Sequence, residues 1–198
     1  MPYAKKTLAN LQQSLADKIS AGVVPTSSVK LSYWNRMLNE GQNYCADMLR
    51  LAKSTSLTTV SGTIAFPDDF LLIDEVINSS GAKLKQINKE DSATAGGGCY
   101  WITGNHFDGW SLNTNNDETY TVWYVFKPSE MSATSDLCII PDPVAVVCYA
   151  YSKLRMAQTD PLEDADKEMG ECNRRLDEVI SANSANDGGI QFKLEPNA

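Results

Sequence analysis

The sequence contains a single histidine, His106. A two-histidine metal site and a pair of histidine acid and base groups are therefore excluded, and a Cys–His or Ser–His catalytic pair would have to use this one residue. Its neighbours Asn105, Asp108 and Gly109 are residue types typical of turns. We therefore interpret His106 as part of a turn and predict no catalytic residue.

Cysteine is present, but its spacing does not favour metal binding or disulfide formation. The five cysteines are odd in number, and no two lie closer than ten residues, so neither a disulfide framework nor a CxxC metal motif is indicated. Buried free thiols are the expectation. The run Gly96–Gly98 leads into Cys99 and a predicted strand rather than into a Lys-Ser or Lys-Thr pair and a helix, so it is not a phosphate-binding loop. We predict no metal and no cofactor.

Long apolar runs are also missing. No segment approaches the roughly 20 apolar residues that a membrane span needs. Residues 1–20 are amphipathic rather than a charged stub followed by an apolar stretch. We therefore expect a soluble protein that is either cytosolic or assembled in the cytosol and that has no membrane partner.

An excess of positive charge is absent too, since the formal net charge is −8. Residues 1–53 carry seven Lys/Arg against three Asp/Glu, whereas residues 54–137 carry four against eleven and residues 138–198 carry six against eleven. Phosphate binding needs clustered cations, so no general surface for nucleic acid is predicted. The two ends of the chain therefore carry opposite net charges. These charges would either help identical copies or a partner to dock, or they would belong to ordinary solvent-exposed faces.

Helical periodicity is clear in the first quarter of the chain. Leucine and isoleucine recur at three- and four-residue steps, which predicts a helix over about residues 4–19. The glycine and proline that follow end it, and Thr26, Ser27 or Ser28 can cap a second, longer helix. The predicted buried side of this second helix contains Val29, Leu31, Trp34, Leu38, Cys45, Met48, Leu49 and Ala52. The two helices are expected to pack as a hairpin.

Strand patterns fill the middle of the chain. The predicted strands begin at about residue 54 and then cover residues 71–78, 83–87, 99–103, 109–112 and 119–126. Pro67 interrupts the pattern, so residues 65–70 are interpreted as a corner, and Ser79-Ser80-Gly81 predicts a hairpin turn. Both faces of residues 119–126 are apolar or aromatic, which favours the centre of a small sheet or sandwich.

Two more helices are predicted after a linker at residues 128–135. Asp142 suits the cap and Pro143 the first position of one helix, and Asp160-Pro161 begins another in the same way. Residues 190–194 alternate like a short strand that has no hairpin partner nearby. They are a candidate for addition to another protein's sheet or groove, or a frayed tail.

These patterns predict an α+β fold. The N- and C-terminal helix pairs form a helical bundle, and an antiparallel β-sheet or small sandwich is inserted between them. The expected parts are a helical hairpin at 1–53, a β domain at 54–135, a helical pair at 136–185 and a C-terminal arm at 186–198.

Carboxylate pairs were considered as the basis of a hydrolase. Asp68 and Asp69, like Asp74 and Glu75, are adjacent in sequence, and successive strand residues point to opposite faces, so neither pair is a natural dyad. On the last predicted helix, acidic residues recur every four positions from Asp160 and so share one face. They could bind a cation, although a solvated acidic face is the simpler interpretation. We therefore predict that the protein is not an enzyme.

Aromatic residues gather in the later strands and could form a sugar-binding platform or a sheet core. They are Tyr100, Trp101, Trp110, Tyr120, Trp123 and Tyr124. The alternative function is accordingly a carbohydrate- or receptor-binding tail domain.

The order of elements carries several short motifs. They are Tyr33-Trp34-Asn35-Arg36, Thr58-Thr59-Val60-Ser61-Gly62-Thr63, Phe66-Pro67-Asp68-Asp69-Phe70 before Ile73-Asp74-Glu75-Val76, and Ile140-Pro141-Asp142-Pro143. This string resembles the head-to-tail adaptor (connector) proteins of tailed bacteriophages, including the tail tubular protein A type of short-tailed phages.

The resemblance implies a structural virion protein of the neck, assembled in the host cytoplasm. It implies a ring, usually of twelve copies, that binds the portal protein and extends the DNA channel to the next tail component, a nozzle or tail tube protein. DNA would pass through without specific binding, because an acidic wall repels phosphates. The implied corner that aims the β domain outward is formed by Phe66, Pro67, Asp68 and Phe70. The implied arm that docks on the portal is formed by Ile190, Gln191, Phe192, Lys193 and Leu194.

Overall fold

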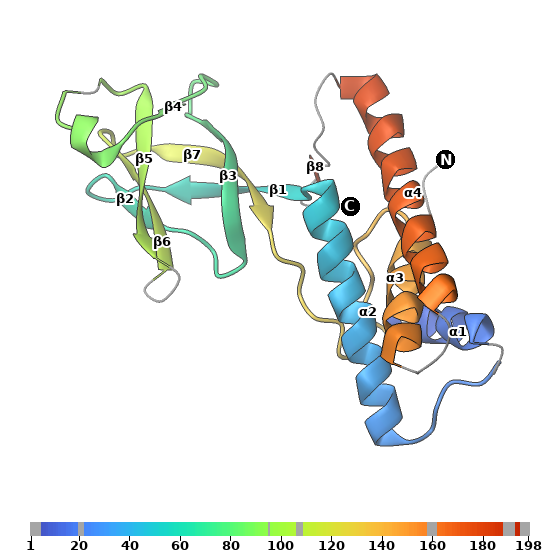
Figure 1. Ribbon diagram of the computed structural model, residues 1–198. Coiled ribbons are helices and arrows are strands. Elements are labelled where there is room, and N and C mark those ends of the chain that lie inside the picture. The colour runs from blue at the N-terminus through green and yellow to red at the C-terminus, as the bar shows by residue number, and fades with distance from the viewer. Residues whose placement is uncertain are drawn as a thin grey trace. The chain divides into compact units, whose positions relative to one another are not determined.

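The protein is seen in a computed structural model that describes residues 5–19, 22–94, 96–105, 109–157, 162–187 and 193–194. It divides into two compact units (Figure 1). The helical unit comprises Met1–Arg50 and Pro128–Gln191, and the β unit comprises Leu51–Lys127 and Phe192–Ala198. The predicted α+β class is confirmed.

The boundaries of the units differ from the expected ones at 53 and 135, because the segment after Lys127 packs on a helix. The side chain of Asn39 donates to the carbonyl of Met131 at 3.1 Å and accepts from the backbone N–H of Met131 at 2.8 Å. Gln42 Nε2 donates to the carbonyl of Ser129 at 3.0 Å. These bonds satisfy backbone groups of a segment without regular structure and hold it in the helical unit.

The first helix, α1, runs over Leu8–Lys18, and the second, α2, over Ser28–Leu49. α1 begins later than expected because Thr7 forms a capping box with Asn10, in which each side chain accepts from the other residue's backbone N–H. Ser27, one of the three expected positions, stands at the N-cap of α2, but its side chain forms no capping hydrogen bond. The helix ends where Arg50 adopts a left-handed conformation with φ 49°.

Three of the side chains expected on the buried face of α2 do not lie there. Val29 is 78% exposed and Met48 45% exposed, whereas Trp34, Leu38, Cys45 and Leu49 are buried as predicted. Ala52 is buried but belongs to a strand. Over a 22-residue helix only the face that meets the rest of the bundle is covered, so apolar residues outside that stripe stay in solvent.

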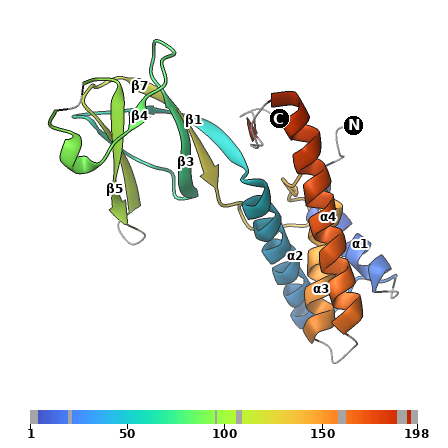
Figure 2. The ribbon, with the colours of Figure 1, turned by 45° about the horizontal axis from the view of Figure 1, so that its top comes forward.

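The third helix, α3, covers Pro143–Ala157 and lies at the centre of the helical unit, where it contacts α1, α2 and α4 (Figure 2). Its residues Ala145, Val146, Val147, Cys148 and Ala150 are all buried. A helix that is apolar nearly all round is expected in such a central position.

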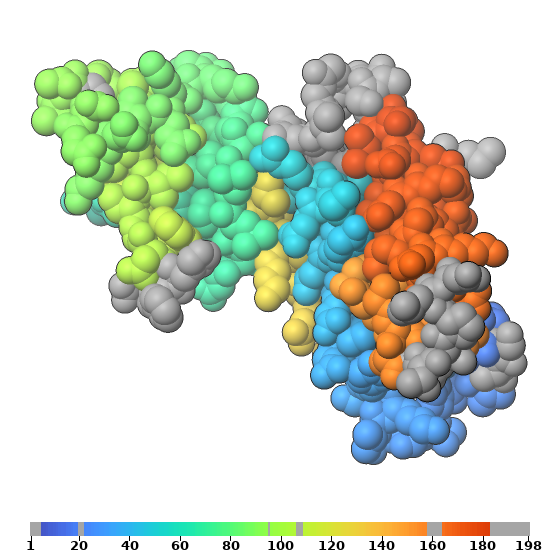
Figure 3. Space-filling view, in the orientation of Figure 1, coloured from blue at the N-terminus to red at the C-terminus, as the bar shows by residue number. Residues whose placement is uncertain are grey.

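The fourth helix, α4, covers Leu162–Asp187 and packs chiefly on α3. It extends two residues beyond the expected end of the helical pair at 185, into the expected arm. Ala165, Cys172, Leu176 and Val179 form its buried stripe. In the space-filling view, α2 and α4 both form part of the exposed surface of the helical unit (Figure 3).

The described residues of the β unit form two four-stranded sheets. One has the order β3-β7-β1-β8 and the other β2-β6-β5-β4. The strands are β1 Ala52–Thr58, β2 Thr63–Ala65, β3 Phe70–Ile77, β4 Lys85–Gln86, β5 Cys99–Asn105, β6 Gly109–Thr114, β7 Thr119–Phe126 and β8 Lys193–Leu194, and a 3-10 helix, η1, covers Lys89–Asp91. Most pairings are antiparallel, but β8 on β1 and β4 on β5 are parallel.

β7 is an inner strand of the first sheet, as its two-sided apolar pattern predicted, and β1 is the other. Tyr120, Val122 and Tyr124 alternate along its core face and are all buried. β3 and β1 flank it in antiparallel register. A strand that pairs on both edges and buries one face against the core needs apolar or aromatic side chains on that face.

Two turns divide the strands. A turn at Ser61 and Gly62, whose φ values are 54° and 72°, separates β1 from β2. The predicted hairpin between residues 71–78 and 83–87 is present but short: besides the bridge between Ile77 and Lys83, the N–H of Asn78 donates to the carbonyl of Ala82 at 2.9 Å and the N–H of Leu84 donates to the carbonyl of Val76 at 2.8 Å. After that bridge Leu84 is buried, and the chain crosses to the other sheet and pairs there with β5.

Candidate interaction surfaces

The predicted corner is a compact aromatic cluster at the start of β3. The rings of Phe66 and Phe70 stack with centroids 4.0 Å apart and planes 10° apart, and Phe70 contacts Tyr124 at 5.9 Å. Phe70 donates its N–H to the carbonyl of Pro67 at 3.0 Å, which closes the turn. Asp68 is exposed.

The carboxylate that holds the corner is Asp69, which the sequence analysis did not single out from its neighbour. Its side chain forms an ion pair with Lys53 of β1 and accepts from the hydroxyl of Tyr124 at 3.1 Å. Its carbonyl accepts from the N–H of Lys127 at 2.8 Å. The Lys53 ammonium also lies 4.6 Å from the ring centroid of Phe126.

Tyr124 is affected by the same contacts. Burial, followed by the nearby negative charge of Asp69, raises the pKa of Tyr124 well above its ordinary value. The phenol therefore stays protonated and remains a hydrogen-bond donor to Asp69. The sequence signal that was missed is the alternation of β7, which places Tyr124 on the core face.

Replacing Asp69 with alanine is expected to destabilise the β unit by about 1–2 kcal/mol, because Tyr124 loses its acceptor and Lys53 its partner. Asp68→Ala is the matched control and is expected to change stability by less than about 0.5 kcal/mol, since its side chain is exposed. Urea unfolding followed by near-UV circular dichroism measures both. Equal losses from the two variants would contradict the assignment.

The predicted portal arm is only partly within the described residues. Ile190, Gln191 and Phe192 lie outside them. Lys193 and Leu194 form β8, which pairs in parallel with Ala52 and Lys53 of β1 in the same chain. The predicted strand character of these two residues is confirmed, and their strand partner lies about 140 residues away in sequence.

The aromatic residues do not form one platform. Tyr100, Tyr120 and Tyr124 are buried. Trp123 lies on the opposite face of β7 from Tyr124, because successive strand residues alternate. In the second sheet Trp101 pairs with Asn113, while Trp110 shares the other face of β6 with the buried Leu112. The register therefore places Trp101 and Trp110 on opposite faces of the second sheet.

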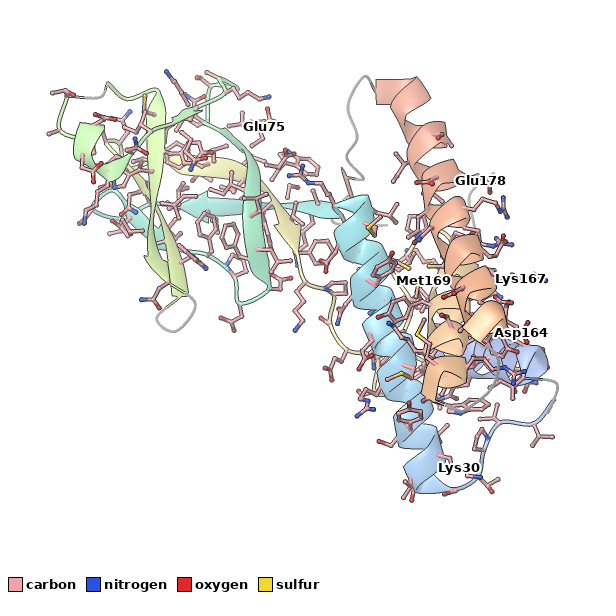
Figure 4. All side chains as sticks on the ribbon, viewed as in Figure 1. Lys30, Glu75, Asp164, Lys167, Met169 and Glu178 are labelled. Atoms are coloured by element: carbon pink, nitrogen blue, oxygen red, sulfur yellow. The ribbon has the colours of Figure 1, made fainter. Side chains whose placement is uncertain are left out.

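Two of the carboxylates form ion pairs within the chain. Glu75 forms an ion pair with Lys83 at 2.9 Å, and Glu168 pairs with Lys18. Figure 4 shows Glu75 on the β unit and Asp164 on α4. His106 and Asp160 lie outside the described residues. Among the residues that the structure describes, no group of three or more His, Cys, Asp or Glu side chains is placed to hold a metal ion.

A buried ion pair joins α3 to α4. The side chain of Asp142 is 2% exposed; it accepts from the N–H of Val144 at 3.0 Å and from Arg175 Nη1 at 2.8 Å. Arg175 Nε also donates to Glu171 at 2.8 Å. The hydrogen bond with Asp142 raises the pKa of Arg175. Asp142 was predicted as a helix cap, and the structure adds its role as an anchor for α4.

One end of the helical unit has an apolar hollow of about 570 Å³, here called the tip pocket. Its apolar lining includes Ile19, Val23, Pro25, Val29, Trp34 and Leu154. Its polar lining is Lys30, Tyr33, Tyr151 and Arg155, and the described lining contains no Asp or Glu. Figure 4 shows Lys30 at the first turn of α2. The helical spacing of Val29 predicts a buried side chain, so the sequence alone does not indicate this pocket.

A second hollow, of about 750 Å³, follows the polar face of α2. It is lined by residues that include Asn35, Arg36, Asn39, Asn43 and Met131. Asn39 is already bonded to the backbone of Met131. Its lining is therefore mainly polar and partly engaged within the chain.

Comparison with known proteins gives one family. The family model described as SU10 adaptor protein matches residues 6–190, which includes the described parts of the helical unit and most of the β unit. No curated protein matches the chain. In the described residues, no helix is both long enough and apolar enough to cross a membrane.

Proposed function

The chain belongs to the SU10 adaptor family of bacteriophage head-to-tail adaptors, and from this premise we propose that it forms a ring between the portal and the tail. Membership implies a structural protein of the virion neck. The match over residues 6–190 is the observation that carries the proposal, because it spans helices and strands of both units.

In the proposed ring the helical unit forms the wall and the β unit the outer contact domain. The wall of such a ring has to resist deformation. The central position of α3 and the Asp142–Arg175 ion pair would both stiffen the helical unit. The ring would contain about twelve copies, as the sequence resemblance implies. The tail tubular protein A type remains our proposal for the subtype.

The proposed channel carries DNA without binding it. The net charge is −8, and the exposed surface of α4 contains Asp164, Asp166, Asp177 and Glu178. Such a surface repels phosphates. Lys167 and Arg174 interrupt it, and Arg174 is paired with Glu171 and Glu178. The hydrogen bond from Arg174 is the main cause that lowers the pKa of Glu171 to about 2, so that carboxyl keeps its charge.

The proposed partners are further copies of the chain, the portal protein and the next tail component. Residues 190–194 are the proposed portal arm. The pairing of Lys193 and Leu194 with β1 supports this role, because an extended segment of this kind adds to a sheet edge. In the virion that edge would belong to the portal or remain the chain's own β1.

Electron microscopy of the chain mixed with purified portal tests the proposal. We expect full-length protein to add a ring to the portal, and a chain truncated after Asn186 to lose at least about tenfold in portal affinity, because the arm is removed. A Gly81→Ala variant, altered in an exposed turn, is the control and should bind normally. Full-length chains that stay monomeric with the portal would overturn the proposal.

A further inference from the structure

The exposed apolar side chains are concentrated at two places. In the described part of the chain, eight large apolar residues are more than 40% exposed. Val23 and Val29 line the tip pocket, and Met156 follows Arg155 in the last turn of α3 beside it. Leu71 and Leu72, exposed by 46% and 49%, directly follow the corner. Clusters of this kind mark contact surfaces more often than scattered single residues do.

A bulge in β3 explains why two consecutive leucines are exposed. The register shifts between Phe70 and Leu72, so that one extra residue stands opposite β7. Regular alternation would turn one of the two leucines toward the core. The bulge instead leaves both exposed, three and four residues after the exposed Asp68. The corner therefore presents an apolar protrusion, Leu71 and Leu72, with the carboxylate of Asp68 close by in sequence.

The tip pocket has the complementary character. Its walls are apolar, and its charged lining residues are Lys30 and Arg155. Arg155 is held by the hydroxyl of Tyr151, to which its Nε donates at 2.8 Å. Lys30 is exposed. A surface that carries two leucines and a carboxylate would therefore find apolar walls for the leucines and a cation for the carboxylate.

We propose that the corner of one copy docks in the tip pocket of the next copy, with Leu71 and Leu72 inserted and Asp68 beside Lys30. This rests on the proposed function in one respect, since it assigns the contact to neighbours in a ring of identical chains. The two surfaces differ from each other, so the contact is heterologous, and its repetition gives a ring when the rotation from copy to copy closes, as the proposed ring on the portal requires. The occupant is a second copy of this chain.

Photocrosslinking tests the contact directly. A photoreactive phenylalanine analogue replaces Val29, and portal-templated assemblies are made from a mixture of isotopically heavy and light chains. We expect crosslinks from position 29 to residues 68–73 of a different chain, seen as heavy–light peptide pairs. The same analogue at the exposed position Val60, which lies outside both surfaces, is the control. Crosslinks from position 29 only to the portal, to other segments, or to nothing would overturn the proposal.

A charge exchange gives an independent test. Lys30→Glu and Asp68→Lys are each expected to weaken ring formation on the portal by about tenfold or more, and the double variant to recover to within about threefold of the original chain. Lys127→Glu adds negative charge next to the same strands and is expected to leave ring formation unchanged. Additive losses in the double variant would contradict the Asp68–Lys30 pairing.

The outcomes separate this contact from the proposed function. If the original chain forms no ring on the portal, the proposed function fails. If the original and both single charge variants form rings equally well, the adaptor function stands and the corner–pocket contact is wrong.

Discussion

Replacing Arg175 with methionine is expected to destabilise the helical unit by about 3–5 kcal/mol, since it leaves the Asp142 carboxylate buried without its cation. The cost comes from desolvation rather than from the lost attraction alone. Asp142 is 2% exposed, and its remaining described partner is the N–H of Val144. Urea unfolding followed by the far-UV helix signal measures the change.

Arg174 offers the matched control on the same helix. Its side chain is 52% exposed and pairs with Glu171 and Glu178 in solvent, so Arg174→Met is expected to cost less than about 1 kcal/mol. The double variant with Asp142→Asn and Arg175→Met is expected to recover part of the loss, because the uncompensated charge is gone. If Arg175→Met costs no more than Arg174→Met, the buried pair does not anchor α4.

Replacing Gly62 with alanine is expected to destabilise the β unit by about 3 kcal/mol. Gly62 has a φ of 72°, and an added Cβ would lie 2.5 Å from the carbonyl oxygen of Thr114. That residue's N–H donates to the carbonyl of Gly62 at 2.8 Å, so the clash cannot be relieved without loosening the link to β6. The left-handed conformation and the displaced backbone both contribute.

Gly81 separates these two contributions. It has a φ of 83°, but an added Cβ would meet nothing within 4 Å, so Gly81→Ala is expected to cost only about 1 kcal/mol. Thermal unfolding followed by near-UV circular dichroism compares the variants. A Gly62→Ala loss no greater than that of Gly81→Ala would show that the turn relaxes freely.

The periodic elements were predictable because local patterns decide them. Leucines at three- and four-residue steps predicted α1, and the Asp142-Pro143 pair predicted the start of α3. The strand at 119–126 was placed correctly to its ends and at the centre of its sheet. The order of these elements also carried the resemblance to adaptors that the family match supports.

The candidate surfaces were less predictable because they depend on partners distant in sequence. Asp68 and Asp69 are chemically identical neighbours, and only the approach of Lys53 and Tyr124 distinguishes them. The tip pocket requires residues from α1, α2 and α3 together. Val29 fits a buried helical position by spacing alone, yet no described segment of the bundle covers it enough to bury it.

The α+β class, the helical pairs around a strand-rich middle and the family resemblance could all be predicted from local patterns, because hydrophobic period and turn residues act over a few positions. Three features depend instead on the folded chain: β4 pairs in the second sheet, Asp142 is buried against Arg175, and a bulge exposes Leu71 and Leu72. Those outcomes follow from which surfaces pack against each other, and the free energy of packing is shared among residues far apart in the chain.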